Sequence, residues 1–341
     1  MKAMKLIFRL TILLSTLLVT ACMQSTATLN AGETPEWLSS EPDMYPNFSY
    51  LSATGSAAGA EQAKARALSN LAKIFEVQIR EVSSTQQDIQ TSKKEGVETV
   101  QKSQRLSSMV NLKTDKMVQG ARIAEQWINS ADLTYHALAV LDRAQAGNNI
   151  RDEMNRLDEE TGFVLDQQVK RNDLLLKISD LYKANELQQD RNTLQQTLKV
   201  IDVKGSGTPA HWNQAELAEQ LQKTLRSLPL QTVVKADDTG ELSNILQGAA
   251  SSAGFNIGNT GYQLAANLVI QQPINKDNWF WLRGTLEIEL VAQDGVTVIG
   301  YQSWPLKVSA GALSQLQPRL LKAADEKLKQ ELLNSILEFV R

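Results

Sequence analysis

The chain has 341 residues, of which 42% are hydrophobic and 21% are charged, and this is the composition of a globular protein. Its 35 Lys and Arg residues against 38 Asp and Glu residues give a net charge of −3, so the basic excess of nucleic-acid-binding proteins is missing. One Cys and two His residues exclude an internal disulfide and multi-cysteine zinc sites, and they disfavour histidine-dependent catalysis. We therefore expect two domains, no nucleic-acid partner, no metal or cofactor, and no enzymatic activity.

The first 22 residues have the pattern of an export signal. Three basic residues precede an apolar run over residues 10–21, which is shorter than the roughly 20 residues that span a bilayer. The run ends in Leu-Val-Thr-Ala before Cys22, and this sequence resembles the lipobox of bacterial lipoproteins. The resemblance implies that residues 1–21 are removed and that Cys22 is acylated. The alternative is an ordinary secretory signal with a chance cysteine.

The residues after Cys22 predict the location of the protein. Met23, rather than Asp, follows the cysteine, and in lipoproteins of bacteria with two membranes this implies transfer to the outer membrane. Residues 22–35 are small and polar, which favours a flexible tether. We expect a protein that is lipid-anchored to the outer membrane and faces the periplasm.

Residues 36–142 have the element pattern of a small α+β domain. We expect a strand over residues 48–54, a small-residue loop over 55–59, and a helix that ends near Ile74. A strand that includes Val77 and Ile79 follows, and strands over 118–128 and 133–141 form a hairpin. The residues expected to face the sheet from the helix are Ala63, Ala67, Leu71 and Ile74.

Four parts of this domain carry a family resemblance. They are Trp37, the segment from Tyr50 to Ala57, residues 63–72 and residues 135–143. Together they resemble the Lpp-twenty lipoprotein family over about residues 36–143. The same kind of domain occurs in flagellar accessory lipoproteins and flagellar assembly protein T. The resemblance implies an envelope-associated, non-enzymatic module that often assembles with copies of itself.

The segment from Ser83 to Ser108 is rich in Ser, Thr and Gln and has few aliphatic residues. We interpret it as two long, solvated strands whose unpaired backbone groups could pair with a neighbouring copy. A mobile polar hairpin is the alternative.

Residues 143–200 predict a helical connector. Apolar residues recur at helical spacing from Ile150 to Leu181, in two amphipathic helices broken near residues 170–172 or 184–185. Polar residues interrupt the stripe, so we expect the helices to pack on the protein's own domains and not in a long coiled coil.

Residues 201–341 predict a second α/β domain with a mainly antiparallel sheet. Helices alternate with strands over 230–234, 264–270, 279–291 and 296–308, and a helix over 313–340 closes the chain. This element order is similar to the periplasmic domains of CsgG, the middle domain of flagellar assembly protein T, and penicillin-binding-protein activator lipoprotein B. The predicted fold class of the whole chain is α+β.

The last hairpin holds the predicted partner surface. If Asp294 and Gly295 form a two-residue turn, Thr285 faces Trp304 and Arg283 faces Leu306. Aromatic residues beside an Arg on one sheet face are typical of an interaction surface, although another domain of the same chain could cover them. The residues assigned to this surface are Trp279, Trp281, Arg283, Trp304 and Leu306.

Three further features have structural explanations that we favour over functional ones. The turn from Gly55 to Gly59 lacks the full dinucleotide-binding fingerprint, so we do not expect it to bind a phosphate. His136 lies in an alternating strand, and the acids Asp237 and Asp238 precede a helix. We expect a structural or assembly component of the envelope, flagellum-associated or ring-forming. The alternative is an activator of a peptidoglycan synthase, and a hydrolase is disfavoured.

Overall fold

The computed structural model describes residues 29–30, 33–90 and 120–340. The chain divides into two compact units, residues 1–147 with 200–205 and residues 148–199 with 206–341. The predicted α+β class is confirmed, because both units combine helices with mainly antiparallel sheets. Within the described residues, every helix is too short or too polar to cross a membrane.

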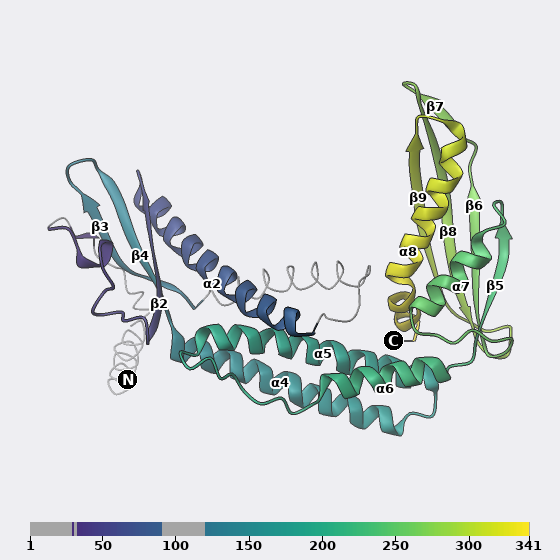
Figure 1. Ribbon diagram of the computed structural model, residues 1–341, viewed down its shortest axis with the longest axis horizontal. Helices are drawn as coiled ribbons and strands as arrows, with labels where there is room; N and C mark the ends of the chain where they lie inside the picture. Colours follow the sequence, from purple (N-terminus) through teal and green to yellow (C-terminus); the bar gives the residue numbers. More distant parts are fainter. Residues whose placement is uncertain (1–28, 31–32, 91–119, 341) are drawn as a thin grey trace, which may run out of the picture. The chain divides into compact units, whose positions relative to one another are not determined.

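The first unit is a four-stranded sheet with one long helix packed on it (Figure 1). Its strand order is β1-β3-β4-β2, and only β1 pairs in parallel, with β3. A short 3-10 helix, η1 (Glu36–Leu38), precedes β2. The bounds are β1 Leu29–Asn30, β2 Tyr50–Ala57, α2 Ala60–Gln90, β3 Arg122–Asn129 and β4 Thr134–Asp142.

Helix α2 packs closely on β2 because small residues lie where the helix and the strand meet. Ala63, Ala67 and Leu71 are almost fully buried, as expected, but Phe75 and not Ile74 completes this row. Gly55 lies beneath the helix, and a Cβ atom there would stand 2.2 Å from the backbone nitrogen of Ala67. Gly55 belongs to β2 and not to the predicted loop, so its role is close packing of a helix on a strand.

The polar segment after Ile74 is helical where the structure describes it. Helix α2 continues to Gln90, so the predicted strand at residues 77–79 and the predicted strand start at Ser83 are wrong. Residues 76–90 contain neither Gly nor Pro and include several Glu, Gln and Arg residues, so no local signal ends the helix. Residues 91–108, the rest of the predicted polar strands, lie outside the described residues.

Two long helices, α4 (Arg143–Lys170) and α5 (Leu174–Ile201), follow the first sheet. The chain breaks between them at the first of the two predicted positions, where the Asp173 carboxylate accepts a hydrogen bond of 2.9 Å from the Leu176 backbone N–H. Leu175 and Ile178 of α5 belong to the core of the C-terminal sheet. This part of the helical pair therefore packs on the protein's own domain, as expected.

A buried polar cluster joins α4 and α5 at Arg191, which is only 1% exposed. Its guanidinium donates to the Asp158 carboxylate at 3.2 Å and to the carbonyl oxygen of Pro209 at 2.6 Å. Gln188 donates to Asp158 and to the Thr161 hydroxyl, both at 2.9 Å. Asp158 and Thr161 of α4 are thus hydrogen-bonded to Gln188 and Arg191 of α5 inside the unit.

The C-terminal sheet has five strands, and α7 and α8 lie on one of its faces (Figure 1). Strands β5 and β6 pair in parallel, and the other pairs are antiparallel. Helix α6 (Gln214–Ser227) precedes the sheet, and its Leu225 lies in the same core. The bounds are β5 Leu230–Asp237, α7 Leu242–Ser252, β6 Tyr262–Ile270, β7 Ile274–Lys276, β8 Trp279–Val291, β9 Val298–Ala310, η2 Leu313–Gln315 and α8 Leu316–Glu338.

The β8–β9 hairpin contains a bulge that the sequence analysis missed. Val291 pairs with Val298, which is the predicted register, but Leu290 pairs with Gly300, so Ile299 is an extra residue. From this point to the far end of the ladder every partner is displaced by one residue. The Asp294 turn is also longer than predicted, since Ala292 donates its backbone N–H to Thr297 across a loop at 2.7 Å.

Candidate functional site

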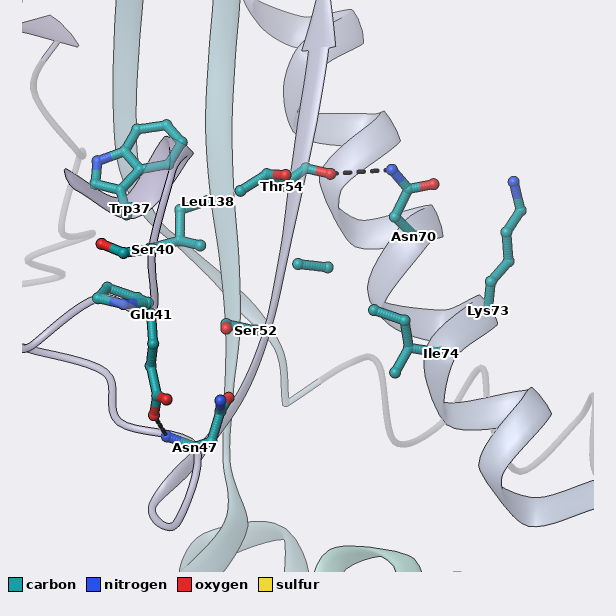
Figure 2. A pocket seen from close by; sticks show the side chains of 12 residues that line it. Trp37, Ser40, Glu41, Asn47, Ser52, Thr54, Asn70, Lys73, Ile74 and Leu138 are labelled. Carbon is teal, nitrogen blue, oxygen red and sulfur yellow. Dashed lines mark hydrogen bonds between the residues drawn. The ribbon is translucent and has the colours of Figure 1, made fainter. Parts of the chain in front are cut away.

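A hollow of about 610 Å³ lies beside the outer edge of β2 (Figure 2). The segment that contains Trp37 and Glu41 forms one side of it, and Asn70, Lys73 and Ile74 of α2 contribute the other. The remaining residues that line it come from the segment before β2, from β2 itself and from β4. They are Ser40, Pro42, Asn47, Ser52, Ala53, Thr54 and Leu138.

Backbone groups of β2 point into this hollow. Strand β2 is at the end of its sheet and pairs only with β4 among the described strands. Its Thr54 carbonyl accepts a hydrogen bond of 2.9 Å from the Asn70 side chain (Figure 2), and its Ser56 carbonyl accepts one of 2.6 Å from the Arg66 side chain. Because both backbone groups of a residue in an antiparallel strand point to the same side, the groups of Ser52 also point outward. The hollow thus exposes a strand edge.

The side chains around the hollow suit binding. Trp37 and Ile74 are apolar, and Ile74 is 41% exposed. The Glu41 carboxylate accepts a hydrogen bond from the Asn47 backbone, as Figure 2 shows, while Lys73 carries a positive charge. No group of three or more potential metal ligands occurs in the described part of the chain. An extended peptide is the ligand that such an edge fits best.

The predicted partner surface on the last hairpin is divided between two sheet faces. Trp279, Trp281 and Arg283 lie on the face that α7 and α8 leave open, and Trp279 is 49% exposed. Trp304 and Leu306 are each 8% exposed and belong to the core, because the bulge at Ile299 reverses their direction. The prediction that all five residues share one face is wrong.

The bulge brings a different residue next to the exposed tryptophans. Lys307 pairs with Arg283, and its Nζ atom lies 4.6 Å from the centre of the Trp281 ring. This is a cation–π contact, which stabilises a Lys beside an aromatic ring. Lys307 was absent from the predicted surface because the predicted register put Leu306 in its place.

The opposite end of the same open face holds carboxylates that are already paired. Glu287 accepts hydrogen bonds from the Tyr301 hydroxyl at 2.7 Å and from Asn267 at 3.0 Å. The hydrogen bond to Glu287 raises the pKa of Tyr301 above its usual value. Lys235 forms an ion pair with Glu289.

The other candidates have structural surroundings. His136 lies in β4 with its ring centre 5.4 Å from that of Trp127. The Asp237 carboxylate accepts a hydrogen bond of 2.8 Å from the Leu242 backbone N–H at the start of α7. Partial burial raises the pKa of Asp237, but hydrogen bonds from Thr239 and Leu242 outweigh this effect and leave the pKa below its usual value. Asp238 accepts from the Ile270 backbone at 3.2 Å, and Cys22 lies outside the described residues.

The family model that matches the chain covers a large part of the first unit. Residues 35–142 match the family model of the LPP20 lipoprotein, which confirms the expected family resemblance of this part and supports a lipoprotein of the cell envelope. No curated protein shows significant sequence similarity to the chain. The similarity of the C-terminal element order to other envelope proteins stays a prediction.

Two solved structures resemble the chain in part. The secreted protein HP1454 of Helicobacter pylori is 14% identical, with 84% of this chain and 97% of that chain covered and a TM-score of 0.41. A minor lipoprotein of Acinetobacter baumannii is 16% identical, with 32% of this chain and 90% of that chain covered and a TM-score of 0.27. At these TM-scores neither structure supports a conclusion about this chain.

Proposed function

We propose, from the premise that residues 35–142 are an LPP20-type lipoprotein domain, that the chain is anchored to the outer membrane and serves as a structural or assembly component in the periplasm. The family match is the observation that carries this proposal. The strand-edge hollow supports a binding role, because it offers outward backbone groups and apolar side chains to an extended ligand.

The anchor in this proposal is the acylated Cys22. Buried acyl chains contribute about 0.8 kcal/mol for each CH₂ group, so several chains on one terminus hold a protein on a membrane without a spanning helix. A Cys22→Ser chain should remain unprocessed or appear in the soluble fraction of the cell. Normal processing and membrane fractionation of this variant would contradict the anchor.

The assembly contact in this proposal is the outer edge of β2. An extended segment of a second copy could pair with the outward backbone groups of Ser52 and Thr54, between Trp37 and Ile74. The Asn70 hydrogen bond to Thr54 is exposed, so an incoming strand can replace it. A flagellum-associated or ring-forming assembly is the setting that the family resemblance implies.

Sedimentation of the Cys22→Ser mature chain at several concentrations tests the assembly role. We expect self-association that weakens with Ser52→Pro, since proline removes an outward donor and leaves the pairing with β4 intact. Lys322→Ala, on the exposed surface of α8, is the control and should self-associate normally. A chain that stays monomeric at all concentrations would contradict assembly and favour the alternative, an activator of a peptidoglycan synthase.

A further inference from the structure

The open face of the C-terminal sheet is divided into two ends of different charge. Between Thr285 and the Asp294 turn, the charged residues of β8 have partners within the sheet. Glu287 accepts a hydrogen bond from Tyr301, and Glu289 forms an ion pair with Lys235. At the other end of this face, where β7 pairs with β8, the charged strand residues are basic. They are Lys276, which pairs with Trp279, and Arg283, which pairs with Lys307.

We call this second region the cationic tip, and it consists of Ile274, Lys276, Trp279, Trp281, Arg283 and Lys307. All three basic residues are exposed, and no ion pair joins them to a carboxylate among the residues that the structure describes. The acids near this region are Asp277 in the neighbouring turn and Asp238, whose carboxylate accepts a hydrogen bond from the Ile270 backbone. Because the chain as a whole carries net negative charge, this local excess of positive charge needs a reason.

A two-residue turn joins the two strands of the cationic tip. Asp277 and Asn278 have φ values of 55° and 61°, and they connect Lys276 directly to its partner Trp279. Two such residues form the type I′ turn that matches the twist of paired strands. The turn presents two exposed apolar side chains at the end of the sheet, Ile274 at 53% and Trp279 at 49%.

We propose that the cationic tip docks on a bilayer surface with anionic headgroups. The three cations, none of which has a carboxylate partner among the described residues, complement lipid phosphates. Exposed Trp beside Lys and Arg is the composition found at membrane–water interfaces. Ile274 and Trp279 add apolar surface that can enter the headgroup region. The inference rests on the proposed envelope location, where the lipid on Cys22 would supply the first membrane contact and the tip a second one.

Co-sedimentation with vesicles tests this docking in the absence of the acyl anchor. The probe is the full mature chain with Cys22→Ser, mixed with vesicles of equal parts phosphatidylcholine and phosphatidylglycerol or of phosphatidylcholine alone. We expect binding to the anionic vesicles that weakens with added salt. Arg283→Gln and Lys307→Gln should each lower the partition coefficient about fivefold, since one Lys or Arg near such a surface contributes about that factor.

The control removes the same charge elsewhere in the same unit. Lys223→Gln and Arg226→Gln change two exposed cations of α6 and should leave vesicle binding unchanged. Trp279→Ala should weaken binding at high salt as well, and circular dichroism checks that each variant is folded. The proposal would be overturned if the control variants lost as much vesicle binding as Arg283→Gln and Lys307→Gln. It would also be overturned if the chain bound isolated peptidoglycan and not anionic vesicles. Because no acyl chain takes part, failure here leaves the Cys22 anchor and the assembly role standing.

Discussion

Trp304 lies directly opposite Leu286 in the β8–β9 ladder, and both side chains belong to the core that α8 covers. Lys327 of α8 has its Nζ atom 5.9 Å from the centre of the Trp304 ring. Trp281 pairs with Ser309 on the other face of the same two strands. One residue in the bulge thus determines which tryptophans stabilise the fold and which can meet a partner.

Trp304→Ala and Trp279→Ala should therefore differ strongly in their effect on stability. Trp304 is 8% exposed, so its removal leaves a cavity in the core and should lower the free energy of unfolding by about 3–5 kcal/mol. Trp279 is half exposed at the end of the sheet, and its removal should change this free energy by about 1 kcal/mol or less. Urea denaturation of the two variants measures both effects, and similar losses would contradict the observed register.

Gly55→Ala should destabilise the first unit by about 3 kcal/mol, because the new methyl group would collide with the backbone of α2 near Ala67. Neither backbone can move without separating the helix from the sheet. Gly59→Ala is the matched control, since a Cβ atom at Gly59 meets nothing within 4 Å. Thermal unfolding should show a large loss for the first variant and almost none for the second. Equal stability of the two would argue against close packing of α2 on β2.

Local patterns in the sequence predicted the parts of the fold that depend on local interactions. The spacing of Ala63, Ala67 and Leu71 identified the buried face of α2, and the break between α4 and α5 lies at the first of the two predicted positions, residues 170–172. The β3–β4 hairpin has a polar turn between two strands that contain aromatic and β-branched residues, which is a signal contained within one segment. The prediction for the end of α2 was wrong, because Val77 and Ile79 have the spacing of strand residues although they lie within the helix.

The bulge could not be predicted, because its cause lies far away in the sequence. A Cβ atom at Gly300 would stand 2.0 Å from the Phe339 side chain beyond α8, so only a glycine fits at that place. Without the bulge, Ile299 would face Leu290 in the position that Gly300 occupies. The β2 hollow could not be predicted for the same reason. It is formed by residues from separate parts of the chain, near Trp37, Thr54, Lys73 and Leu138.

Asp158→Ala should lower the free energy of unfolding by about 3–5 kcal/mol, because it leaves the buried Arg191 charge without its carboxylate. The variant also removes the acceptor of Gln188. Glu153→Ala is the control on the same helix, since its partner Arg156 is exposed and such surface pairs contribute about 0–1 kcal/mol. Chemical denaturation compares the two variants, and equal losses would show that the Arg191 cluster contributes little.

The Asp294 turn should make part of the stability depend on pH. Hydrogen bonds from the Thr297 hydroxyl and from the backbone N–H groups of Thr297 and Val296 lower the pKa of Asp294 to about 2. An Asp in the unfolded chain has a pKa near 3.9, so the folded state favours the ionised carboxylate. The resulting stabilisation is fully present above about pH 4 and is lost as the pH falls towards about 2.

Asp294→Asn should accordingly be less stable than the parent chain at neutral pH and should approach it as the solution is acidified. The measurement is the difference in urea midpoint between the two chains at a series of pH values, in which the titration of other groups cancels. Asp277→Asn is the control, because its carboxylate accepts no hydrogen bond among the described residues and its difference from the parent should stay small throughout. A difference for Asp294→Asn that stays constant from neutral pH down to about 2 would contradict the role of the charged carboxylate in this turn.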